Sequence, residues 1–137
     1  MGICWQGNTS HRNDKHRSMP WDTFKAALPS GIEYVNLCRE QPAGDLPPAT
    51  FTHFGETRDM LLTCDYVVTV DTGVAHLAAD LGIPTWMLVG LPMDWRWGTP
   101  GARLTKWYPT MAIYWQTTAG DWTQPLADIR KDLEMRR

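Results

Sequence analysis

The sequence predicts an α/β fold in which a doubly wound parallel sheet lies between two layers of helices. Two observations predict it: short runs of strand length alternate with helix-patterned segments, and several of these runs are continuously apolar. Continuous apolar runs are typical of parallel strands covered on both faces, and strands that alternate with helices are joined by right-handed crossovers. The 137 residues are enough for one such domain, so residues 1–137 are treated as a single domain.

The first half of the chain begins with a strand, a polar segment and a helix. Residues 3–5 are an apolar run that ends before Gly7, and they predict the first strand. Apolar residues recur at helical spacing over 21–28, and Pro29 ends that helix. The next expected elements are a strand over 32–38, a proline-rich loop over 41–50, a short strand over 51–54 and a helix over 56–64.

The second half contains the clearest strand, because residues 66–70 are almost entirely apolar and β-branched. Asp71, Thr72 and Gly73 interrupt this run, and a helix rich in small residues follows and ends at Gly82. The remaining expected elements are a helix over 74–81, strands over 84–89 and 112–115, a long aromatic loop over 91–111 and an amphipathic helix over 123–134.

Composition excludes several classes of protein. Thirteen Lys and Arg against fifteen Asp and Glu give a net charge of -2, so we expect no nucleic acid partner and only a local anion site. The 3 cysteines are widely spaced, which fits buried thiols in a reducing compartment better than disulfides, and no metal-ligand spacing is visible. The longest apolar stretch, 83–93, is shorter than the about 20 residues that span a bilayer. No signal peptide is visible, and we expect a cytoplasmic protein.

One candidate site lies where the clearest strand passes into a helix. In open parallel sheets, ligands bind outside the carboxyl ends of the strands, where Asp71 and Thr72 would lie. Gly73 would let a ligand approach the backbone, and the first turn of the helix offers free N–H groups to an anion. His76 falls near that turn and could donate to a phosphate oxygen. The alternative is that the polar residues only cap the helix while His76 packs.

A second candidate site follows the first strand. The polar segment over 7–18 contains Arg12, Lys15 and Arg17, and it opens onto the same edge of the sheet. Basic side chains with exposed amides could hold a diphosphate. The segment matches neither the dinucleotide-binding glycine pattern nor the P-loop. The alternative is a solvated polar loop.

A third candidate is aromatic. The chain has 8 Trp against 4 Tyr and 3 Phe, and Trp95 and Trp97 lie on the long loop over 91–111. Their rings could stack on a base or a sugar, or they could cover the edge of the core.

Together these segments resemble a known family of sugar transferases. The pattern Val68-Thr-Val-Asp71-Thr72-Gly73-x-x-His76-Leu-x-x-x-Leu-Gly-x-Pro84 resembles the hallmark of the heptosyltransferases, glycosyltransferase family 9. The ordered set of segments is similar to the C-terminal domain of bacterial tetratricopeptide-repeat proteins fused to such a glycosyltransferase. The set consists of Ile3-Cys-Trp-Gln-Gly-Asn, His11-Arg-Asn-Asp, Arg17-Ser18, Asp94-Trp-Arg-Trp, Trp107-Tyr-Pro and Gly120-Asp-Trp122. The resemblance covers nearly the whole chain and implies the Rossmann-like C-terminal half of a GT-B fold.

The resemblance also implies a nucleotide-sugar donor site. In the family, the Asp-Thr-Gly loop and the helix behind it hold the donor diphosphate, with basic side chains from the first loop. Here the implied diphosphate-binding residues are Asp71, Thr72, Gly73, His76, Lys15, Arg17 and, less directly, Arg12. The implied nucleoside-binding residues are Glu40, Phe54 and Gly55, and Trp95 and Trp97 are candidate sugar contacts. The donor would be ADP-, GDP- or UDP-linked, with no metal and no other cofactor.

The implied function is donor binding in a glycosyl transfer reaction. Helix amides and basic side chains would stabilise the leaving nucleoside diphosphate electrostatically. No residue is assigned as the catalytic base, because GT-B enzymes usually place it on an N-terminal acceptor domain. An N-terminal domain, a partner chain or self-association would complete the enzyme, and the chain alone is expected to be inactive. The alternative is a stand-alone nucleotide-binding or regulatory interaction domain without transferase activity.

Overall fold

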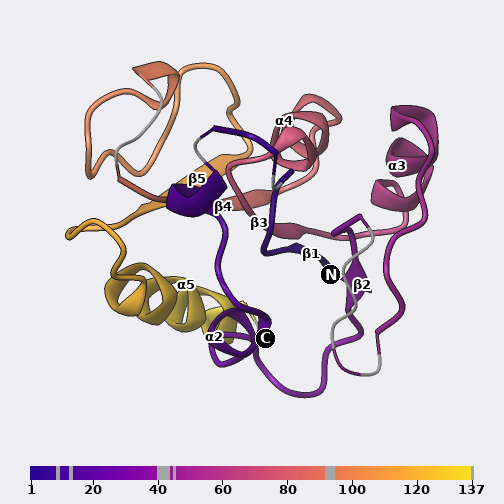
Figure 1. The fold of residues 1–137 in the computed structure, drawn as a ribbon, viewed down its shortest axis with the longest axis horizontal. Helices are drawn as coiled ribbons and strands as arrows, with labels where there is room; N and C mark the ends of the chain where they lie inside the picture. The colour runs from indigo at the N-terminus through magenta and orange to yellow at the C-terminus, as the bar shows by residue number, and fades with distance from the viewer. Residues whose placement is uncertain (9, 13, 40–43, 45, 92–94, 137) are drawn as a thin grey trace.

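The computed structural model describes residues 1–8, 10–12, 14–39, 44, 46–91 and 95–136. It contains one parallel sheet with helices on both faces (Figure 1). The strands are β1 (Gly2–Cys4), β2 (Val35–Asn36), β3 (Val67–Val70), β4 (Thr85–Val89) and β5 (Met111–Trp115). The helices are α1 (Asp14–Arg17), α2 (Trp21–Lys25), α3 (Phe54–Leu61), α4 (Gly73–Asp80) and α5 (Thr123–Met135), with a 3-10 turn, η1 (Trp95–Trp97). This arrangement confirms the predicted fold class.

The sheet order is β2-β1-β3-β4-β5, and every pairing of neighbouring strands is parallel. The chain runs outward from β1 to β2 and then crosses back to β3 on the other side of β1. The connections after β1 and β3 therefore leave the sheet in opposite directions from adjacent strands. Such a switch point in the strand order opens a crevice at the carboxyl ends of the strands.

The helices form two layers. Figure 1 shows α3 and α4 on one face of the sheet and α2 and α5 on the other. On the second face, the Arg130 guanidinium of α5 donates a hydrogen bond to the carbonyl of Ala26, just after α2. The predicted amphipathic stripe of α5 is confirmed for Ile129 and Leu133, which are 0% and 2% exposed. Within the described residues, no helix is long and apolar enough to cross a membrane.

The strand expected over 51–54 is wrong, because the chain begins helix α3 at Phe54 instead. His53 is the N-cap residue, and its Nδ1 accepts a hydrogen bond from the Gly55 amide at 3.1 Å. The Glu56 carboxylate reaches back to the Thr52 amide at 2.7 Å. The two phenylalanines, Phe51 and Phe54, favour a strand, but these local hydrogen bonds satisfy free amides at a helix start and outweigh that preference.

The structure adds a short helix, α1, inside the polar segment over 7–18, where the sequence predicts no helix. It packs against the carboxyl end of β4 at a point where only glycine fits. A Cβ on Gly90 would lie 1.7 Å from the carbonyl oxygen of His16. The missing side chain therefore lets α1 rest on the sheet edge, next to the crevice between β1 and β3.

Candidate functional site

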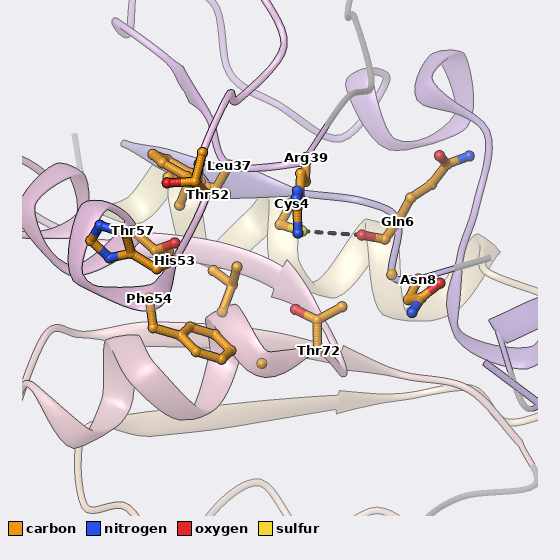
Figure 2. Close-up of a pocket in the computed structure, with 14 residues that line it drawn as sticks. Cys4, Gln6, Asn8, Leu37, Arg39, Thr52, His53, Phe54, Thr57 and Thr72 are labelled. Carbon is orange, nitrogen blue, oxygen red and sulfur yellow. Dashed lines mark hydrogen bonds between the residues drawn. The ribbon is translucent and has the colours of Figure 1, made fainter. Parts of the chain in front are cut away.

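A pocket of about 620 Å³ opens at the carboxyl ends of β1, β2 and β3. Its position agrees with the crevice that the strand order produces. Figure 2 shows lining side chains from β1 and its following loop, from the segment after β2, and from the starts of α3 and α4. The lining residues are Cys4, Gln6, Gly7, Asn8, Leu37, Arg39, Phe51, Thr52, His53, Phe54, Thr57, Thr72, Gly73 and Val74.

The start of α4 brings free backbone amides to this pocket. Thr72 is the N-cap residue in an extended conformation, yet its side chain makes no capping hydrogen bond. Its hydroxyl is instead 3.3 Å from the hydroxyl of Thr69. Among the described residues, no acceptor meets the amides of Gly73 and Val74, which both line the pocket. Two N–H groups and the positive end of the helix dipole are therefore available to an anion.

The start of α3 faces the same pocket but does not offer such a site. The Gly55 amide is already bound to the His53 ring, and Glu56 places a carboxylate in the first turn. Hydrogen bonds from the backbone and the hydroxyl of Thr52 hold the pKa of Glu56 below its usual value. This carboxylate stays charged at neutral pH and would repel an anion. The two helix starts therefore differ: the start of α4 offers free amides to an anion, and the start of α3 does not.

Phe54 contributes an aromatic ring beside this amide pair. The ring is 68% exposed, although large apolar side chains are usually covered. A Cβ on Gly73 would lie 3.4 Å from two atoms of the ring, so the ring stands against the start of α4 (Figure 2). An exposed ring at the wall of a pocket is a stacking surface for a planar group such as a base. The predicted nucleoside residue Phe54 thus lines the pocket, whereas Gly55 is absent from its described lining.

Arg17 joins the two loops that the sequence analysis placed at one edge of the sheet. Its Nε donates to the Asp14 carboxylate at 3.2 Å, and its Nη1 donates to the Asp71 carbonyl at 3.0 Å. Ser18 adds to the cluster by donating to Asp14 at 2.7 Å and accepting from the Gly7 amide at 2.9 Å. The prediction that both loops meet at one edge is confirmed. Arg17 holds the loops together and brings a positive charge beside Gly7.

The side chains of Asp71 and His76 are held by the aromatic loop after β4. The Trp97 indole N–H donates to the Asp71 carboxylate at 2.9 Å. The His76 ring stacks on Trp97, and its Nδ1 is 2.9 Å from the Tyr108 hydroxyl. His76 lies about 200° around the helix from the pocket-lining Val74, since each residue turns about 100°. In this structure the side chains of Asp71 and His76 both contact the loop after β4. A direct contact of either side chain with a phosphate stays a prediction.

The other predicted residues have different outcomes. Trp97 is 1% exposed and packs in a core cluster with Met87, so the structure favours the interpretation that it covers the core. Lys15 and Arg12 have exposed side chains outside the described pocket lining, and their phosphate contacts stay predictions. Glu40 and the side chain of Trp95 lie outside the described part of the structure.

The pocket also contains residues that sequence reasoning missed. Arg39, the residue directly after the strand expected over 32–38, is the lining residue with a permanent positive charge in the described part of the pocket. Cys4 lies at the pocket, although the sequence indicated only a buried thiol. A signal for Arg39 was available, because it follows a strand that ends at the same edge as the other candidate loops.

A comparison with protein-family models decides the family. Residues 33–105, more than half of the chain, match the model of glycosyltransferase family 9 (heptosyltransferase). The chain belongs to glycosyltransferase family 9. No curated protein and no solved structure matches the chain. The matched region contains α3, β3 and α4, and so includes the aromatic ring and the free amides of the pocket.

Membership in family 9 implies glycosyl transfer from a nucleotide-sugar donor, a ligand that combines a planar base with a diphosphate. The pocket places an exposed aromatic ring beside two free amides, which are the groups that such a ligand needs. In the described residues, no group of three or more His, Cys, Asp or Glu side chains could hold a metal ion.

Proposed function

We propose that this chain binds the nucleoside-diphosphate-sugar donor of a family 9 glycosyl transfer reaction. The observation that carries the proposal is the pair of free amides, Gly73 and Val74, opening onto the pocket beside the exposed ring of Phe54. The diphosphate lies at the start of α4, and the base lies against Phe54. The pocket volume of about 620 Å³ is within the usual range for small-molecule sites.

The positive charges near the pocket suit the leaving group of the reaction. Cleavage of the bond between sugar and phosphate leaves an extra negative charge on the nucleoside diphosphate. Fixed N–H groups stabilise that charge without having to reorient, and Arg39 and Arg17 add positive potential near the pocket and its rim. Lys15 is exposed on α1 and is the further basic residue that we assign to the phosphates. The proposal requires no metal ion or other cofactor.

The acceptor site and the catalytic base are proposed to come from outside residues 1–137. The described lining residues of the pocket include no Asp or Glu that could take a proton from an acceptor hydroxyl, and the Nδ1 of the lining His53 already accepts a hydrogen bond from the Gly55 amide. Asp71 is held by the Trp97 indole instead. An N-terminal acceptor domain, a partner chain or a second copy would supply the base. A larger protein in which this domain follows tetratricopeptide repeats, as in the proteins whose C-terminal domain the sequence resembles, would be one such setting.

Calorimetric titration tests donor binding directly. ADP, GDP and UDP should each be compared with the corresponding nucleoside and with inorganic pyrophosphate. We expect at least one nucleoside diphosphate to bind more tightly than its nucleoside, because only the diphosphate reaches the amides of α4. Absence of binding by all three diphosphates at millimolar concentration would refute the proposal. Sugar transfer by the chain alone would refute the requirement for a second domain or chain.

A further inference from the structure

Two buried thiols lie in contact at the inner end of the pocket. Cys4 is the last residue of β1, and Cys38 follows the neighbouring strand β2. Their sulfur atoms are 3.5 Å apart, and both cysteines are free. The side chains are 2% and 1% exposed, but the pocket reaches Cys4. A small molecule in the pocket therefore has access to one thiol of a close pair.

The hydrogen bonds around the pair give the two sulfurs different character. The Cys38 thiol donates to the Cys4 sulfur, and this lowers the pKa of Cys4 despite its burial. Burial raises the pKa of Cys38, with a further contribution from its bond to Cys4. The thiol nearer to the pocket is thus the better thiolate, and the deeper one stays protonated. This division matches the roles of an attacking and a resolving cysteine.

We propose that Cys4 and Cys38 form an oxidation site, which a hydroperoxide entering the pocket converts to a disulfide that weakens nucleotide binding. The effect on binding rests on the proposed function, whereas the oxidation itself does not. The site does not depend on the residues that are assigned to the diphosphate.

The reaction balances with the peroxide as the two-electron oxidant. The Cys4 thiolate attacks one peroxide oxygen, the O–O bond breaks, and the leaving oxygen takes up a proton as water or an alcohol. Cys4 is then a sulfenic acid. The sulfur of Cys38 attacks the Cys4 sulfur, the S–S bond forms, and the hydroxyl leaves with the Cys38 proton as water. Two thiols are oxidised, and one peroxide is reduced.

Disulfide formation would alter the rim of the pocket. A disulfide bond is about 2.05 Å long, so the sulfurs must approach by about 1.5 Å from their separation of 3.5 Å. Both sulfurs also lie within hydrogen-bond distance of the Gln6 carbonyl, at 3.3 and 3.8 Å, and Gln6 lines the pocket (Figure 2). Oxidation removes the thiol hydrogens, so neither sulfur can donate to this carbonyl. Because Gly7 follows Gln6 and lies beneath the Arg17 guanidinium, the change is transmitted to the loop beside α4.

The third cysteine provides a matched control. Cys64 is also buried, at 8% exposure, but its sulfur is bound to the Met60 carbonyl rather than to another thiol. It is absent from the described lining of the pocket. Cys64→Ser therefore removes a buried thiol of similar exposure and leaves the proposed site unchanged.

The first experiment measures oxidation in the folded 137-residue chain. Native protein is treated with graded hydrogen peroxide, then alkylated under denaturing conditions and mapped by peptide mass spectrometry. We expect an intramolecular Cys4–Cys38 link, with the loss of two hydrogens and of two titratable thiols. Cys64→Ser should react in the same way, while Cys4→Ala and Cys38→Ala should form no intramolecular disulfide. Oxidation confined to Cys64, or thiols that react only after unfolding, would overturn the proposal.

The second experiment measures the effect on the pocket. Nucleoside diphosphate is titrated into reduced and oxidised samples of the wild-type and Cys64→Ser proteins. We expect the dissociation constant to rise by about tenfold on oxidation, the effect of roughly one lost hydrogen bond, and to return after reduction with dithiothreitol. Equal affinity in both states would overturn the coupling. A Cys4–Cys38 link in a protein that binds no nucleotide in either state would support the oxidation site and refute the proposed function instead.

Discussion

Replacing Gly73 by proline removes one of the two free amides of α4 without requiring a different backbone. Gly73 is the first residue of the helix, a position where proline is well tolerated because that N–H has no partner within the helix. The preceding residue, Thr72, has φ -139° and ψ 173°, and this extended conformation suits a residue before proline. Gly73→Pro should therefore fold normally and lose only the ability to donate this hydrogen bond.

The expected loss of affinity follows from the charge of the ligand. A hydrogen bond to a charged group contributes about 1.5–3 kcal/mol, and each 1.4 kcal/mol corresponds to about tenfold in affinity. The dissociation constant for a nucleoside diphosphate should rise by about 10- to 150-fold. Gly73→Ala is the matched control, because it adds a Cβ at 3.4 Å from the Phe54 ring but keeps the N–H.

The comparison uses calorimetric titration of both variants, with thermal unfolding as a check on the fold. The dissociation constant of Gly73→Ala for the nucleoside diphosphate should lie within a few-fold of the wild-type value. Gly73→Pro should bind the same ligand far more weakly, although its thermal unfolding midpoint should be similar. Equal affinity of the two variants would refute the claim that this amide binds phosphate. An equal loss in both would show that the missing side chain matters rather than the N–H.

Three further changes test other contacts. Phe54→Ala should raise the dissociation constant for a nucleoside diphosphate by about 5- to 150-fold, since stacking of a base contributes about 1–3 kcal/mol. The affinity of Phe54→Ala for pyrophosphate should not change, and the exposed control Leu62→Ala should keep the wild-type affinity for the nucleotide. An equal loss of affinity in either measurement would contradict the placement of the base against Phe54. Trp97→Phe removes the donor to Asp71, and urea unfolding should show a free energy of unfolding lower by about 1–3 kcal/mol. An unchanged free energy of unfolding would count against a stabilising role of this hydrogen bond. Gly90→Ala should destabilise the fold by about 1–3 kcal/mol in the same assay through its clash with α1, and a wild-type midpoint would contradict this packing.

Sequence patterns predicted most of the fold because the central strands are continuously apolar. The strand expected over 66–70 is β3 over Val67–Val70, and the helix expected over 74–81 is α4 over Gly73–Asp80. Gly82, with φ 77°, stands where the sequence analysis ended that helix. The error over 51–54 arose because its two phenylalanines favour a strand, while the hydrogen bonds of a helix start act between neighbouring side chains and amides.

The candidate site was predictable in position and less so in the direction of its side chains. Strand ends and a helix start placed Thr72 and Gly73 at the pocket, and the structure finds them there. A motif does not indicate which way Asp71 and His76 point, because that depends on Trp97 and Tyr108, from a loop distant in sequence. Contacts of this kind follow from the packing of the whole chain, and local periodicity carries no information about them.

The same limit applies to the thiol pair. Cys4 and Cys38 are 34 positions apart, and their spacing matches no redox motif. They meet because β1 and β2 are neighbours in the sheet, with Ile3 opposite Asn36. Only the strand order brings the two sulfurs together, so the pair was visible in the structure and not in the sequence.

The central claim is that the first amides of α4 bind the donor diphosphate. Amide chemical shifts, followed by NMR during titration with a nucleoside diphosphate and with pyrophosphate, test it most directly. We predict the largest shifts for the Gly73 and Val74 amides with both ligands, and shifts around Phe54 with the nucleotide alone. Shifts centred on the start of α3 at Gly55 and Glu56, with Gly73 and Val74 unchanged, would contradict it.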